Sequence, residues 1–134
     1  MKIGLDTSVV VRLLTGEPGD QARRALVEVE YLRRRGTVLV VSDLVISEVY
    51  FALQYHYGVP KVEALRCMEL FLAKSGVAAL GAAASVLRLP NLATAEPGFV
   101  DRLIHAEYMR SAKEVLTFEK SGARLPGVRV LAPS

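Results

Sequence analysis

The fold expected for this chain is decided by its first eleven residues, MKIGLDTSVVV, from Met1 to Val11. The apolar stretch 3–5 predicts a short strand, and the run that follows Thr7 predicts a helix directly after it. Asp6 lies at the junction, so the strand would present one carboxylate at its own carboxyl end. Open α/β sheets bind their ligands at that edge, which makes Asp6 the first candidate functional residue.

The rest of the chain alternates between strand and helix patterns. The expected strands cover residues 2–6, 37–41, 77–80, 115–117 and 128–131, and the expected helices cover residues 8–14, 19–35, 43–57, 60–74, 82–89 and 97–113. This alternation predicts an α/β fold with a mostly parallel sheet covered on both faces. Right-handed crossovers would then place the carboxyl ends of all strands on one rim.

Composition indicates a single soluble domain over residues 1–134. Seventeen Lys and Arg against fourteen Asp and Glu give a net charge of +3, which is compatible with a polyanionic partner without requiring one. The longest uncharged stretch, residues 75–87, is too short to span a bilayer, and no signal-peptide pattern precedes the first strand. We therefore expect a cytoplasmic protein with no membrane association.

The only cysteine, Cys67, excludes an intrachain disulfide and a cysteine-based zinc site. We expect it to be a small buried side chain on a helix.

Four carboxylates in apolar surroundings are the candidate catalytic and metal-binding residues: Asp6, Glu48, Asp101 and Glu119. Alternating strands and helices would bring all four to the same rim. Repelling anions in one place need a compensating charge, and hard oxygen ligands select Mg²⁺ or Mn²⁺.

Glu48 carries the strongest argument for a cation. It is the only formally charged side chain between Leu44 and Pro60, and helical spacing stacks it with Leu44, Phe51 and Tyr55. We expect this helix to be apolar almost all round, so an unpaired carboxylate there would need a cation.

Each of the four acids also has a purely structural explanation. Asp6 would cap the following helix, and Asp101 would favour a helix amino terminus through the dipole. Glu119 would be a solvated turn residue, and Glu48 would pair with a distant arginine. Only their joint position on one rim favours a metal site over these separate explanations.

Four segments resemble the motifs of the PIN-domain family in order and at fitting separations: residues 5–10, 42–49, 99–104 and 115–128. The resemblance covers the whole chain and is greatest to the toxin ribonucleases of VapBC toxin–antitoxin pairs. It implies a three-layer α/β/α fold with a mostly parallel sheet of about five strands. It also implies a Mg²⁺- or Mn²⁺-dependent endoribonuclease with an RNA substrate, a small DNA-binding antitoxin as partner, and a homodimer.

The resemblance matches Asp6, Glu48 and Asp101 to the three acids of the family. Glu119 stands where the family usually has Asp or Asn, and Ser121 where a further Asp is common. These two departures keep an alternative open, a weakened or inactive PIN-fold module that binds RNA or protein. A phospho-aspartyl enzyme is a further alternative, but Ser8 replaces the second Asp that such phosphatases need.

Several other side chains have candidate supporting roles. The hydroxyls of Ser8 and Thr117 would orient carboxylates or water, or act as ordinary cap and strand residues. His105, one helical turn after Asp101, would pair with that acid, protonate a leaving oxygen, or form an ordinary helix contact. The candidates for binding RNA phosphates are Arg12, Arg102, Arg110, Lys113, Lys120 and Arg124.

Overall fold

The amino-terminal strands form a parallel sheet. In the computed structural model, which describes residues 1–133, β1 (Lys2–Gly4) pairs with β2 (Val38–Val41), and β2 pairs with β3 (Ala78–Ala79). The strand order is β1-β2-β3, so β1 and β3 are the two edges. The short apolar run before Asp6 thus forms the strand that its sequence predicts.

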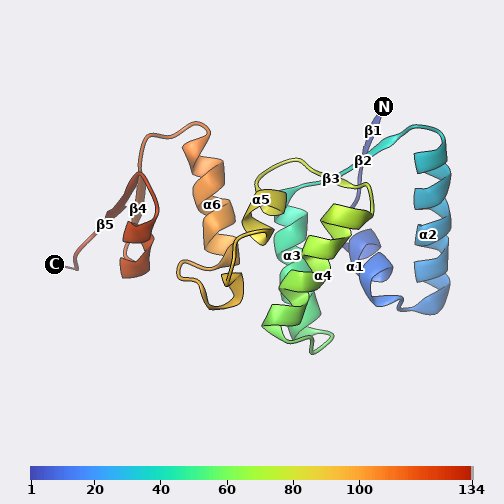
Figure 1. The fold of residues 1–134 in the computed structure, drawn as a ribbon, viewed down its shortest axis with the longest axis horizontal. Helices are drawn as coiled ribbons and strands as arrows, with labels where there is room; N and C mark the ends of the chain where they lie inside the picture. The colour runs from blue at the N-terminus through green and yellow to red at the C-terminus, as the bar shows by residue number, and fades with distance from the viewer. Residues whose placement is uncertain (134) are drawn as a thin grey trace.

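Helices connect these strands and extend the chain beyond them (Figure 1). They are α1 (Thr7–Thr15), α2 (Gly19–Arg34), α3 (Asp43–Tyr55), α4 (Lys61–Lys74), α5 (Ala83–Leu87) and α6 (Phe99–Met109), with short 3-10 helices at Leu92–Thr94 (η1) and Lys120–Arg124 (η2). The predicted α/β class is confirmed. Within residues 1–133, no helix is both long and apolar enough to cross a membrane.

The last two strands form a separate sheet. β4 (Val115–Thr117) and β5 (Val128–Val130) pair in parallel with each other alone within the described chain. Figure 1 shows them at the opposite end of the elongated molecule from β1. The five expected strands are therefore present and parallel, but they are divided between two sheets, a division that the sequence pattern did not predict.

The hydrophobic core lies between the first sheet and helices α1, α3 and α4. Leu39 of β2, Ile46 of α3 and Met68 of α4 are fully buried in it. Phe99, at the start of α6, is also buried, and its ring meets the Tyr50 ring edge-on with centroids 5.2 Å apart. This aromatic contact fastens the amino-terminal end of α6 to α3.

A carboxylate outside the candidate site joins α3 to the segment after β3. Both oxygens of Asp43 accept hydrogen bonds, from the backbone N–H groups of Ala82 and Ala83, at 3.0 Å each. Gly81 passes so close that a Cβ there would overlap the Asp43 carboxylate. Asp43 thus satisfies two N–H groups at the start of α5 and helps to fix the first turn of α3, on which Glu48 depends.

Cys67 is exposed on α4, contrary to the burial expected for it. Its helix buries Ala64, Leu65 and Met68 instead, and Cys67 lies between them on the face that points to solvent. Composition alone favours a buried cysteine, but the helical position decides the outcome.

Candidate functional site

Asp6 and Glu48 line one pocket between α1 and α3. Asp6 occupies the N-cap position of α1 with extended backbone angles (φ −80°, ψ 164°), but its side chain makes no capping hydrogen bond. Its carboxylate is exposed at the carboxyl end of β1, in the pocket that Glu48 and Arg12 also line. The capping explanation for Asp6 therefore does not account for its carboxylate.

Thr7 holds Glu48 in place across the two helices. Its hydroxyl donates a hydrogen bond to Oε1 of Glu48 at 3.0 Å, joining the first turn of α1 to the second turn of α3. The sequence pattern favoured Ser8 for such a role, whereas in the structure Thr7 makes the contact. The available signal was a hydroxyl residue directly after the acid that ends the strand.

Glu48 is exposed, which corrects the expectation that its helix is apolar and buried almost all round. The predicted stacking is present, but Leu44 and Tyr55 on the same stripe are 73% and 80% exposed, and Phe51 is also exposed. Helical spacing correctly identified residues that share a face, but no part of residues 1–133 covers that face. Because the Glu48 carboxylate is exposed, water can solvate its charge. The expected cost of burying that charge is therefore not a reason to expect a bound cation.

Asp101 and Glu119 line a second pocket, between α6 and the β4–β5 sheet. Asp101 is exposed in the first turn of α6, and Glu119 is exposed two residues after β4. The backbone N–H of Glu119 donates to the hydroxyl of Thr117 at 3.0 Å, so Thr117 shapes the turn that presents Glu119. Ser121 is partly buried in the same pocket.

His105 attaches the β4–β5 sheet to α6. Its Nε2 lies 2.7 Å from the carbonyl oxygen of Pro126, and it must donate there because a carbonyl can only accept. Arg124 makes a similar attachment, donating to the carbonyl of Glu96 at 3.0 Å. The structure thus gives both side chains contacts that hold the fold together.

Of the other basic candidates, Arg12 is the one beside an acidic pair. Its Nε donates to Oε1 of Gln21 at 2.7 Å, which fixes the guanidinium at the rim of the pocket containing Asp6. Arg102 is instead engaged at Nε with the carbonyl of Pro97, at 2.7 Å. Arg12 is therefore the cation best placed to meet a phosphate near Asp6.

The four candidate acids are divided into two pairs within one chain. Across residues 1–133, no three or more His, Cys, Asp or Glu side chains gather closely enough to hold a metal ion. In that same part of the chain, none of the four acids forms an ion pair. Exposed, uncompensated carboxylates are suitable donors for a hard divalent cation, but each pocket by itself supplies only two.

Comparison with known proteins identifies the family. The PIN domain family matches residues 3–124, which include all four candidate acids. Searches of curated proteins and of solved structures found no match. PIN domains are typically nucleases, and those nucleases generally use divalent metal ions. Because the match spans most of the sequence, this chain belongs to the PIN domain family.

Proposed function

We propose that this protein is a Mg²⁺- or Mn²⁺-dependent endoribonuclease that hydrolyses RNA phosphodiester bonds. The family match supports nuclease chemistry in general. One observation supports particular residues as the active site: Asp6 and Glu48 are both exposed in one pocket at the carboxyl end of β1. Carboxylates at that edge of a parallel sheet stand where α/β proteins bind their ligands.

We propose Asp6 and Asp101 as direct metal ligands, one from each of the two pockets. Glu48 would bind a second ion or hold a water, and Glu119 belongs to the outer edge of the site. When bound, a divalent cation supplies an acidified water and stabilises negative charge on the phosphate. The hydrogen bond from Thr7 keeps one Glu48 oxygen oriented, and the Arg12 guanidinium neutralises a phosphate next to the scissile bond.

We further propose that the protein is the cytoplasmic toxin of a VapBC-type pair. The basis is the resemblance of this chain to that group in size and in its terminal motifs. Its partner would be a small DNA-binding antitoxin that covers the acidic pockets and presents an arginine to them. Co-purification of such a protein, encoded beside this gene, is the test of this part of the proposal.

The nuclease proposal is tested by cleavage of a structured RNA with Mg²⁺ or Mn²⁺. Asp6→Asn should lower the rate at least about 100-fold, because it removes a ligand charge while keeping the shape of the side chain. The matched control is Asp20→Asn, at an exposed acid in the first turn of α2 outside both pockets. Cleavage that persists unchanged in Asp6→Asn would refute the site assignment.

A binding module without catalytic activity is the second candidate function. It is favoured by the division of the acids into two pairs and by Glu119 and Ser121 at positions where the family often has Asp. This function predicts RNA binding without cleavage in either metal, and no saturable Mn²⁺ binding. Metal-dependent cleavage by the wild type excludes it.

A further inference from the structure

The outer edge of β1 is unpaired in the part of the chain that the structure describes. On its inner side, the Leu5 N–H donates to the carbonyl of Val40 at 2.9 Å. Because successive residues of a strand direct their backbone groups to opposite sides, Lys2 and Gly4 direct theirs away from β2. The strand order β1-β2-β3 leaves this side of β1 without a partner strand among residues 1–133, and both Lys2 and Gly4 are exposed.

β4 has a second unpaired edge. On the side of β5, the Val115 N–H donates to the carbonyl of Gly127 at 2.8 Å. The backbone groups of Leu116 and Phe118 therefore point to the side where no strand from residues 1–133 lies. Their side chains are 54% and 67% exposed. Exposed apolar strand edges are templates for pairing with another chain.

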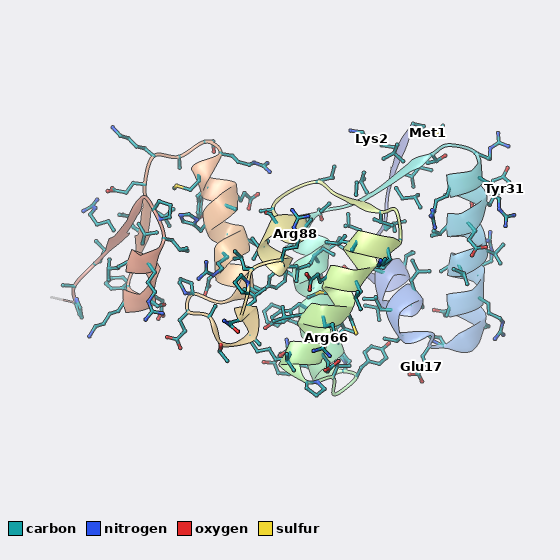
Figure 2. All side chains as sticks on the ribbon, viewed as in Figure 1. Met1, Lys2, Glu17, Tyr31, Arg66 and Arg88 are labelled. Carbon is teal, nitrogen blue, oxygen red and sulfur yellow. The ribbon has the colours of Figure 1, made fainter. Side chains whose placement is uncertain are left out.

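The two edges are far apart within one chain. Figure 2 shows Lys2 at the end of β1, with α3, α5 and α6 between it and the β4–β5 sheet in this view. The packing of Phe99 on Tyr50 fixes α6 to the body, and the contact of His105 with Pro126 fixes the second sheet to α6. Pairing of β1 with β4 in the same chain would disrupt these attachments, whereas pairing with a second copy preserves them.

We propose that two copies of this chain pair β1 of one with β4 of the other, in parallel and reciprocally. Each copy has both edges, so a twofold axis satisfies all four and closes the assembly as a dimer. The dimer contains two five-stranded sheets, each with β3, β2 and β1 from one copy followed by β4 and β5 from its partner.

This pairing brings the divided acids together. Asp6 is the second residue after Gly4 at the end of β1, and Glu119 is the second residue after Thr117 at the end of β4. Adjacent parallel strands in register place residues at equal offsets side by side. Each site then has Asp6 and Glu48 from one copy and Asp101 and Glu119 from the other, so neither copy has a complete site alone. The catalytic meaning of this site rests on the proposed nuclease function; the strand pairing does not.

Mixing two inactive variants tests the shared site. Asp6→Asn and Asp101→Asn are co-expressed with different tags, or unfolded and refolded together, so that mixed dimers form. A mixed dimer has one site with both substitutions and one site with neither. Half of the dimers are mixed, so the preparation should recover about a quarter of wild-type activity. If the site is built within one chain, mixing restores nothing, and the proposal is overturned.

The matched control mixes Asp6→Asn with Glu48→Gln. Both substitutions lie in the same half of the site, so every site in every dimer retains one of them and no activity should return. Recovery of activity in this control would also overturn the proposed division of the site between copies.

The mass of the full-length protein tests the strand pairing without reference to activity. Light scattering should give twice the chain mass of 14.6 kDa for the wild type. Leu116→Pro removes an N–H from the free edge of β4 and should give the single-chain mass. In the control Val130→Pro, the lost N–H points away from β4, and the dimer should persist.

These mass measurements distinguish the proposed strand pairing from the proposed nuclease function. A wild type at the single-chain mass, or a Leu116→Pro variant that stays dimeric, overturns the pairing even if RNA is cleaved. A dimer that Leu116→Pro dissociates, but that cleaves no RNA, supports the pairing and contradicts the proposed function.

Discussion

The first sheet with its helices and the β4–β5 sheet differ in how they are stabilised. Within residues 1–133, every buried hydrophobic residue lies between Leu5 and Leu103 and so belongs to the first region. Among residues 110–133, Gly122 is the only buried residue. The first region thus has a core of its own, whereas the second depends on its contacts with α6 and on whatever covers its exposed side chains. Asp6 and Glu48 belong to the region with the core, whereas Glu119 belongs to the region without one. The candidate acids are therefore carried by regions of different stability.

The difference in stabilisation between the two regions is tested most strongly by truncating one phenylalanine in each. Phe99→Ala should lower the free energy of unfolding by about 3–5 kcal/mol, because it leaves a cavity beside Tyr50 and releases α6. Phe118→Ala, at a side chain 67% exposed, should change the stability of the single chain by about 0.5 kcal/mol or less. Urea unfolding measures both. Similar losses for the two variants would mean that the second sheet also has a core.

The connection between Asp43 and α5 should be the next most sensitive feature of the first region. Asp43→Ala leaves the N–H groups of Ala82 and Ala83 without their acceptor and should lower stability by about 1–3 kcal/mol. Gly81→Ala should be comparably harmful, since its Cβ would overlap the same carboxylate. Thermal unfolding checks both variants against Asp20→Ala. Equal melting temperatures for all three would contradict the structural role of Asp43.

Gly122→Ala should loosen the second region alone. The added Cβ would lie 2.9 Å from Cγ2 of Thr117 and 3.2 Å from Cγ1 of Val128, so these side chains or the strands that carry them must shift, at about 1–3 kcal/mol. Amide hydrogen exchange should become faster in β4 and β5 and stay unchanged in α3. Faster exchange throughout the molecule would show that the two regions unfold as one unit.

Substitution of Thr7 should have only a small effect on stability. Thr7→Ala removes one exposed hydrogen bond to Glu48 and should change the free energy of unfolding by only about 0.5 kcal/mol. If Glu48 acts in catalysis, the same change should slow RNA cleavage about 10-fold, and Thr7→Ser should restore the rate. A rate unaffected by Thr7→Ala would place Glu48 outside the reaction.

The secondary structure was largely predictable because it depends on local signals. The strand expected at 37–41 appears as Val38–Val41, and the helix expected at 60–74 appears as Lys61–Lys74. Glycines mark the ends of elements as the sequence suggests: Gly16 follows α1 at φ 73° and Gly36 precedes β2 at φ 81°. The α/β class follows directly from this alternation.

Part of the candidate site was predictable for the same reason. Asp6 lies just beyond a strand, and Glu48 lies on the predicted stripe with Leu44 and Tyr55. The burial of that stripe was predicted wrongly, because helical periodicity shows which residues share a face but not what covers it. The contact between Thr7 and Glu48 was not predicted, because the two residues are 41 positions apart in the chain.

The sequence by itself determined the helices, the five strands, the family and the identity of the acids, all of which are encoded in short stretches of neighbouring residues. Tertiary structure alone decided that the strands form two sheets and that the acids form two pairs. The physical reason is that strand pairing joins residues distant in sequence through backbone groups that are the same in every residue. The sequence pattern of a strand therefore does not identify the strand with which it pairs, and only the folded chain shows which strand edges are paired.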